Sequence, residues 1–281
     1  MISRIRVRQS LGDLALRASR HDTTRTLTIL MYHAVTASTI DDDGQMSVSA
    51  ARFERQMSEL AATGVDVVDL ADGVRGLADG AGARASVAVV FDDGFVGVHD
   101  HAAAALRRRR WPATVFVTTA WVGAAAMPLA EASLGRPLTW REIGALHDAG
   151  MSIGSHTHTH PRLSQQSDAR VREELGESAA RIADRVGVRP RTFAYPFGAF
   201  DSFDDRTREA LADHEYVAGC TTVCGRNGRT TDPLALRRIR VSWCDGEGEI
   251  AKMLAGGYDW YAWVQRVQTL RSAQQTGTTP C

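Results

Sequence analysis

The stretch VVFDDGF, residues 89–95, joins a run of apolar residues to two adjacent aspartates and a glycine. An unbroken run of aliphatic and aromatic residues is typical of a strand that is covered on both faces, as in a parallel sheet. The strand should end where the polar residues begin, which puts Asp92 and Asp93 at its carboxyl end. Two carboxylates in such a place need a partner, and that partner must come from another part of the chain.

Segments typical of strands alternate with segments typical of helices from residue 26 onward. Several of the strand segments are continuous apolar runs, and the repeated order of strand and then helix favours a parallel α/β fold. The predicted strands cover residues 26–32, 65–70, 85–91, 113–119, 151–155, 191–196, 216–222 and 236–241, and the predicted helices cover 49–63, 97–110, 139–150, 168–187 and 204–214.

Polar side chains follow several of these predicted strands. His33 follows the first, Asp92 and Asp93 follow the third, His156 follows MSIGS, and Tyr195 follows RTFA. In an α/β barrel or an open parallel sheet the active site gathers at the carboxyl ends of the strands. These residues, far apart in the sequence, are therefore expected to converge.

The run GSHTHTHP, residues 154–161, supplies three histidines within five residues. Neutral imidazole is a preferred zinc ligand, and a carboxylate such as one of the two aspartates commonly completes a catalytic site of two histidines and one carboxylate. In an extended segment the alternation would put His156, His158 and His160 on one face. If the chain turns after His156, then His156 and His160 converge and His158 points elsewhere. The spacing alone leaves both arrangements open.

The ordered set FDDG, SHTHTHP and FAYPFG resembles the first three motifs of the polysaccharide deacetylase family, the carbohydrate esterases of family four with NodB homology. The resemblance spans most of residues 28–243 and implies a distorted, incomplete (β/α) barrel. It implies that Asp92 is the catalytic base and that Asp93, His156 and His160 bind a divalent ion, with Zn²⁺ as the expected species. The backbone N–H of Phe197 is the implied oxyanion donor.

Two features depart from the commoner family pattern. Many members carry a late histidine as the general acid, whereas the segment LRRIRVSWCDGEGEI contains none. We assign this role to His33, whose motif LMYH resembles the early YH of the branch that deacetylates poly-N-acetylglucosamine. Much of the family also has an arginine at the position of Ala194, where it orients the base. Arg238 or Arg240 could replace it, and Arg238 is favoured.

The remaining residues with polar or reactive side chains give weaker indications. Tyr195 is a candidate wall for a sugar-binding groove because aromatic faces suit pyranose rings. Cys220 and Cys224 are expected to be reduced structural residues, since the chain lacks a dense set of cysteines. His99 and His101 are expected on the solvent-facing side of a helix.

Composition excludes several classes of protein. Thirty-three basic and thirty-three acidic residues give no net charge, which argues against a nucleic-acid partner. The amino-terminal residues contain no apolar segment long enough for a secretory signal or a membrane span, so we expect a cytoplasmic location and no stable membrane insertion.

We divide the chain into an extension (1–25), a NodB-like catalytic domain (26–245) and a carboxyl-terminal helix and tail (246–281).

The predicted function is that of a metal-dependent hydrolase that removes N-acetyl groups from a carbohydrate containing amino sugars. The alternatives are a catalytically silent carbohydrate-binding member of the fold and an amidase that acts on a small molecule other than a sugar. The presence of Asp92 beside the implied ligands favours the enzyme, because a binding module needs no base. The sequence does not choose among a polymer, a lipid-linked saccharide and a small amino sugar as substrate, and it gives no oligomeric state.

Overall fold

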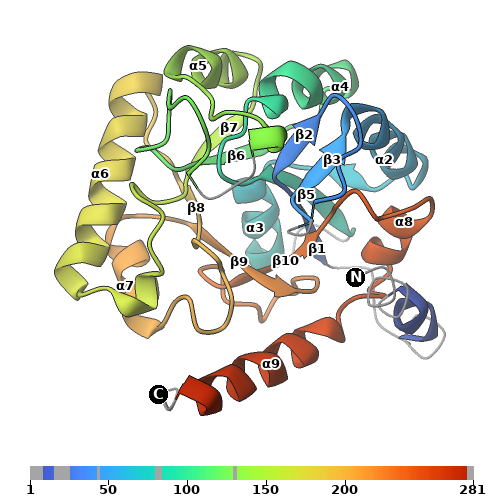
Figure 1. Cartoon of the computed structure of the whole chain (residues 1–281). Helices are drawn as coiled ribbons and strands as arrows, with labels where there is room; N and C mark the ends of the chain where they lie inside the picture. Colours follow the sequence, from blue (N-terminus) through green and yellow to red (C-terminus); the bar gives the residue numbers. More distant parts are fainter. Residues whose placement is uncertain (1–8, 16–25, 43–44, 80–83, 129–131, 277–281) are drawn as a thin grey trace.

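The computed structural model describes residues 9–15, 26–42, 45–79, 84–128 and 132–276. Seven parallel strands form a barrel, which closes where β1 pairs with β5 along its whole length (Figure 1). In order around the barrel the strands are β1 (Leu27–Tyr32), β10 (Leu236–Arg240), β9 (Ala218–Cys224), β8 (Thr192–Ala194), β7 (Ser152–Ser155), β6 (Thr114–Val117) and β5 (Ser86–Phe91).

Three short strands lie outside the closed barrel. β4 (Asp66–Val67) pairs with the amino end of β5, ahead of the point where β6 takes over the same edge. β2 (Ala34–Thr36) and β3 (Ser47–Ser49) form a separate parallel pair just after β1. The small sheet was not predicted, because three-residue strands are too short to show a period in the sequence.

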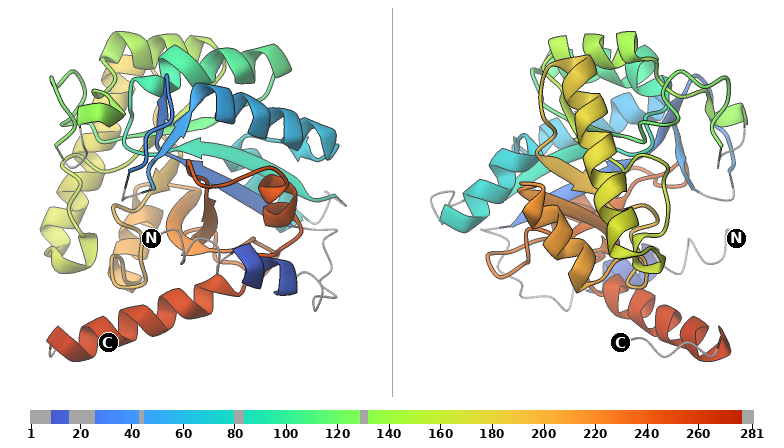
Figure 2. Two further views of the ribbon diagram at one scale, coloured as in Figure 1. Left: turned by 45° about the vertical axis from the view of Figure 1, so that its right-hand side comes forward. Right: turned by 90° about the vertical axis from the view of Figure 1, so that its left-hand side faces the viewer.

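Helices surround the barrel in a ring, as the views in Figures 1 and 2 show. The α-helices are α2 (Ala50–Ala62), α3 (Leu70–Asp79), α4 (Ala103–Arg109), α5 (Trp140–Asp148), α6 (Asp168–Val186), α7 (Asp205–Asp213), α8 (Glu249–Leu254) and α9 (Tyr261–Thr276). A π-helical turn, η1 (Val98–Ala102), leads into α4, and two 3₁₀ turns are η2 (Ala132–Leu134) and η3 (Leu163–Gln165). α9 lies along the outside of the body below the barrel (Figure 2).

Local signals fix where several helices begin. Ser49, Ser167 and Asp204 each precede a helix and accept a hydrogen bond from a backbone N–H of the first turn. Thr139 does the same for α5. Its own backbone N–H donates to the Glu142 carboxylate, which completes a capping box. These caps satisfy N–H groups that have no partner inside a helix, so each start is encoded within four residues.

The apolar side chains of the strands point either outward to the helices or into the barrel interior. Leu30, Tyr32 and Phe91 point outward and pack on buried residues of α2 such as Phe53. Residues of the opposite parity, including Ile29, fill the barrel interior together with the buried residues Met31, Ala88, Val90, Phe116, Ala218 and Leu236. Burial on both faces explains why these strands are continuous apolar runs in the sequence.

The helix α3 packs against the amino end of the barrel interior. Leu70 is buried in the interior cluster, and Val74 and Leu77 pack against it. A side chain at Gly73 would meet Leu27 at 2.9 Å, so a glycine lets the helix approach the first strand closely. Since this end of the barrel is filled, the opposite end, where the strands finish, is left for a site.

The predicted fold class, a (β/α) barrel of the NodB type, is confirmed. One element prediction was wrong in part: the strand predicted over residues 65–70 is only two residues long and gives way to α3. Cys220 and Cys224 are both buried. No helix among the described residues is long and apolar enough to cross a membrane. The proposed domain division stays a prediction.

Candidate active site

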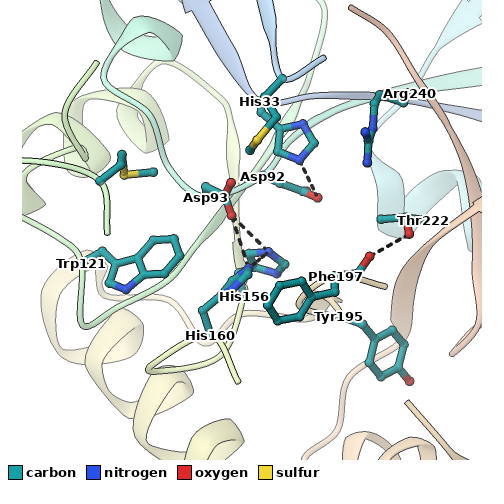
Figure 3. Close-up of a pocket in the computed structure, with 12 residues that line it drawn as sticks. His33, Asp92, Asp93, Trp121, His156, His160, Tyr195, Phe197, Thr222 and Arg240 are labelled. Carbon is teal, nitrogen blue, oxygen red and sulfur yellow. Dashed lines mark hydrogen bonds and ion pairs between the residues drawn. The ribbon is translucent and has the colours of Figure 1, made fainter. Parts of the chain in front are cut away.

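The predicted site residues come together in one cavity at the carboxyl end of the barrel (Figure 3). The cavity has a volume of about 230 Å³. His33 follows β1, Asp92 and Asp93 follow β5, His156 follows β7 and Phe197 follows β8. Its lining residues are His33, Met46, Asp92, Asp93, Trp121, Met127, His156, His160, Tyr195, Phe197, Thr222 and Arg240.

A tight turn after β5 presents both aspartates to the cavity. The Asp92 N–H still donates to the Tyr32 carbonyl at 3.0 Å, so Asp92 is held as an extension of the strand. Asp93 and Gly94 then adopt positive φ angles of 67° and 74°. Aspartate tolerates this left-handed conformation and glycine adopts it without cost, which is the structural reason for the order DDG.

The segment after β7 turns into a loop, so the second of the two open arrangements of the histidines is the one observed. The Nε2 atoms of His156 and His160 lie 3.3 Å and 3.6 Å from Asp93 Oδ1. His158 points away, and its Nδ1 is 2.9 Å from the Thr119 hydroxyl. The positive φ of 64° at His160 turns its ring back toward His156.

The triangle formed by Asp93, His156 and His160 fits a divalent ion. Its three edges are 3.2, 3.3 and 3.6 Å. Ligands of a tetrahedral zinc ion at 2.0–2.2 Å are about 3.3 Å apart, which matches these edges. His156 Nδ1 is 2.6 Å from the Ala194 carbonyl, so it carries the hydrogen and leaves Nε2 as the atom that faces the other two ligands.

Burial and neighbouring charges shift the pKa values within this triangle. Burial lowers the pKa of His160 to about 4, and the positive charge of His156 adds to the effect. For His156 burial is outweighed by the hydrogen bond with Asp93 and by the two carboxylates, which raise its pKa. The contact with His156 and the charges of the histidines likewise overcome burial and hold the pKa of Asp93 well below its usual range. A neutral His160 and an ionised Asp93 are the ligand forms that a metal ion needs.

Asp92 belongs to a different set of contacts. Both of its carboxylate oxygens accept hydrogen bonds from Arg238, at 2.6 and 2.8 Å, and both side chains are buried. The Arg238 Nε–H donates to the Thr221 carbonyl at 2.6 Å, which fixes the guanidinium plane. Burial alone would raise the pKa of Asp92, but the charge of Arg238, together with those of His156 and His33, lowers it overall. Asp92 is therefore an ionised carboxylate that is not part of the candidate metal triangle.

His33 lies on the other side of Asp92. Its Nε2 is 4.0 Å from Asp92 Oδ2, and its Nδ1 has no hydrogen-bond partner within the described part of the chain. Burial lowers the pKa of His33, although the two aspartates act in the opposite direction. Nδ1 is thus free of partners among the described residues, and Nε2 is close enough to the carboxylate for one water or substrate atom to bridge them.

Phe197 and Tyr195 both follow β8, but they have different surroundings. Phe197 has a positive φ of 62°, its carbonyl accepts a hydrogen bond from the Thr222 hydroxyl, and its N–H has no partner among the described residues. The Tyr195 ring is fully buried and stacks on Phe203, and its hydroxyl donates to the Leu234 carbonyl at 2.8 Å. The Tyr195 ring thus packs in the core although the residue lines the cavity, and its contact with substrate stays a prediction.

Several residues of the cavity were not singled out in the sequence. Met46 arrives from the loop before β3, Met127 from the long loop after β6, and Thr222 from β9. Arg240 also lines the cavity, two residues beyond Arg238 on the same face of β10. The two methionines stand in loops without a motif, so only the spatial arrangement brings them to the site.

Comparisons with known proteins agree with this geometry. Residues 79–219 match the sequence model of the family described as polysaccharide deacetylase. The fold is similar to that of the Streptococcus pyogenes deacetylase PplD in complex with acetate, with a TM-score of 0.70, 24% identity, and coverage of 82% of this chain and 98% of that chain. The putative polysaccharide deacetylase BA0330 from Bacillus anthracis gives a TM-score of 0.68, 23% identity, and coverage of 82% and 69%.

Curated relatives match over shorter segments. Chitin deacetylase 1 of Cryptococcus neoformans var. grubii is 35% identical over 83 residues, which are 27% of this chain and 17% of the relative. The chain spans between 3% and 17% of the length of the curated relatives that it matches.

Proposed function

Because the chain belongs to the polysaccharide deacetylase family, we propose that it is a metal-dependent hydrolase that removes N-acetyl groups from a carbohydrate containing amino sugars. One observation carries the proposal: a triangle of ligand atoms with the edges of a zinc site lies beside a separate, ionised carboxylate in the same cavity. In this assignment Asp93, His156 and His160 hold the ion and Asp92 is the base. A carbohydrate-binding module would have no use for the second carboxylate.

The reaction divides among the residues of the cavity. A bound divalent ion would lower the pKa of water and polarise the acetamide carbonyl. Asp92 accepts the proton of the attacking water as the water oxygen bonds to the carbonyl carbon. Arg238 keeps Asp92 ionised before attack and fixes the direction of its lone pairs. The Phe197 N–H, which has no partner among the described residues, is the assigned donor to the oxyanion that forms.

The departing amine requires a proton when the C–N bond breaks. An amine is too basic to leave as an anion, so a donor must stand beside the nitrogen. His33 is the group available, since its Nε2 lies 4.0 Å from Asp92 across the cavity. Transfer of its proton to the nitrogen releases the free amine and acetate.

The rim of the cavity suits a sugar ring. Phe197 is 46% exposed, and its ring lies edge-on to His160 and beneath the Arg162 guanidinium. Trp121 lines the opposite wall, with its ring centre 4.8 Å from that of His160. Aromatic faces pack against the apolar faces of pyranose rings, and the arginine adds a hydrogen-bond donor for hydroxyl groups. This chemistry supports a saccharide over a wholly apolar amide.

The test combines metal analysis with an acetate-release assay. Purified protein should contain one zinc or similar ion per chain and should release acetate from N-acetylglucosamine oligomers or from small N-acetyl sugars. Chelation should abolish release, and Asp92→Asn should lower the rate about 10²-fold or more with the metal retained. A protein that binds metal and sugar but releases no acetate from any of these substrates would contradict the proposal and favour the binding module.

A further inference from the structure

The loop that carries His160 is held from outside by a buried carboxylate. Glu174, on α6, is 1% exposed and has no part in the reaction proposed above. Its Oε2 accepts hydrogen bonds from the backbone N–H groups of His158, at 2.8 Å, and Thr159, at 2.7 Å. Its Oε1 accepts from the Thr159 hydroxyl and from Arg170, both at 2.5 Å. All four donors converge on one side chain, and three of them come from the loop that precedes it by fifteen or sixteen residues.

The loop is not a conformation that its residues favour on their own. Thr157 and His160 have positive φ angles of 66° and 64°, which cost roughly 1–2 kcal/mol for each residue that has a Cβ. Neighbouring segments must therefore hold it in place. The N–H groups of Thr119 and Ala120 bond to the carbonyls of Thr157 and His158 on one side of the loop, and Glu174 binds its N–H groups on the other.

The two histidines of the triangle differ in how their rings are fixed. His156 Nδ1 is held by the Ala194 carbonyl, which sets the direction of its Nε2 directly. His160 Nδ1 is buried and has no hydrogen-bond partner among the described residues. Ring packing against Trp121 and Phe197 and the backbone of the loop are what remain to aim His160.

From this difference we infer that Glu174 is a positioning residue for the candidate metal site, acting on His160 through the backbone of the loop. The inference rests on the proposed assignment of Asp93, His156 and His160 as ligands. Metal-ligating histidines usually have their second nitrogen fixed by a carboxylate or carbonyl, and loss of such a support lowers metal affinity about 10- to 100-fold. Here the carboxylate supports the peptide groups in front of the histidine instead of its ring.

The chemistry explains why a carboxylate is needed. Two backbone N–H groups, a hydroxyl and a guanidinium are all donors, and an ionised carboxylate is a side chain that only accepts. The amide of Glu174→Gln keeps one acceptor oxygen but turns an NH₂ group toward donors. Glu173→Gln is a matched control, because Glu173 is the neighbouring residue, pairs with the same Arg170 at 2.8 Å and makes no hydrogen bond to the loop among the described residues.

The experiment measures zinc affinity by chelator competition and the free energy of unfolding of the metal-free protein by urea. Glu174→Gln should bind zinc about 10- to 100-fold more weakly, and excess zinc should restore most of its acetate release, because Glu174 does not touch the substrate. Glu173→Gln should match the wild type in both measurements. A folded Glu174→Gln protein with wild-type zinc affinity would overturn the inference, even if its stability had fallen.

A second variant covers the case in which Glu174→Gln does not fold. Thr159→Ala removes the hydroxyl donor from Oε1 and leaves the carboxylate with its two backbone partners. It should fold and lower zinc affinity by a smaller factor in the same direction, and an unchanged affinity would count against the inference. A wild-type protein that binds no zinc would instead reject the ligand assignment itself, so the two failures are distinguishable.

Discussion

Replacing Arg238 with methionine isolates the contribution of the buried ion pair behind the candidate base. Methionine has a similar length but no charge, so the Asp92 carboxylate would stay 97% buried without a cation or its two hydrogen bonds of 2.6 and 2.8 Å. Removing one partner of a buried pair costs about 3–5 kcal/mol. The metal-free variant should therefore lose this amount of unfolding free energy at pH 7, whereas Arg237→Met, an exposed neighbour on the same strand, should lose less than about 0.5 kcal/mol.

The pKa of Asp92 determines how the free energy of unfolding of each protein changes with pH. In the wild type burial raises the pKa of Asp92, but Arg238, with help from His156 and His33, lowers it overall. The pair therefore stabilises the fold above the unfolded pKa of an aspartate and loses this effect as the pH falls through the lower folded pKa. Arg238→Met removes the largest of the charges that oppose burial, so that pKa rises. The variant can then protonate Asp92 in mildly acidic solution, so the deficit should shrink as the pH falls below neutrality.

The free energy of unfolding is measured by urea denaturation in the presence of a chelator. Measuring Asp92→Asn and the double variant that combines it with Arg238→Met completes a double-mutant cycle. The double variant should be more stable than Arg238→Met alone, because it no longer buries an unpaired charge. Acetate release by Arg238→Met should be strongly reduced with its zinc content intact, since Arg238 touches none of the three candidate ligands. A loss below about 1 kcal/mol, or two substitutions whose effects simply add, would refute the reasoning.

Three further outcomes are expected. His33→Ala should slow amide hydrolysis about 10²-fold or more with full metal content but slow an activated aryl acetate much less, and equal slowing of both substrates would exclude it as the acid. His160→Ala should lose the bound ion in metal analysis while His158→Ala keeps it; the reverse result would reassign the ligands. Hydrogen bonds from Arg136 and the helix cap hold the pKa of Glu142 at about 2, so its stabilising effect is full above the usual pKa of a glutamate and disappears as the pH falls toward 2. Glu142→Gln should therefore cost about 1 kcal/mol at pH 7 and clearly less at pH 3 in urea titrations, and equal costs would show that the charge is irrelevant.

The sequence predicted the barrel well where burial imposes a clear pattern. Strands such as β1 and β5 are buried on both faces, which produces apolar runs that no solvent-facing segment shares. The sequence did not predict α3, because this helix follows β4 after only two residues and Gly73 and Gly76 interrupt its apolar face. It did not predict the pair β2 and β3, because each strand has three residues and its partner lies beyond a loop.

The site was predictable only as far as residue type and strand end define it. Spacing could not decide whether His158 joins His156 and His160, since the outcome depends on the positive φ angles of the loop rather than on any side chain. Arg238 and Arg240 share one face of β10, and only their depth in the barrel decides which of them meets Asp92. The sequence did not reveal the role of Glu174, because two of its four donors are backbone N–H groups, which every sequence possesses.

The position of β1 between β5 and β10 makes the order of synthesis matter. Leu30 pairs with Val89 on one edge and with Ile239 on the other, so its second partner is translated 209 residues later. At 5–20 residues per second the ribosome needs roughly 10–40 s to cover that distance, during which one edge of β1 has no strand to bond with. Such an edge invites pairing with another nascent chain. The same strand β10 brings Arg238 to Asp92, so a polypeptide interrupted before it would hold a buried aspartate with no counter-charge, and closure of the barrel and neutralisation of that charge happen in one late event.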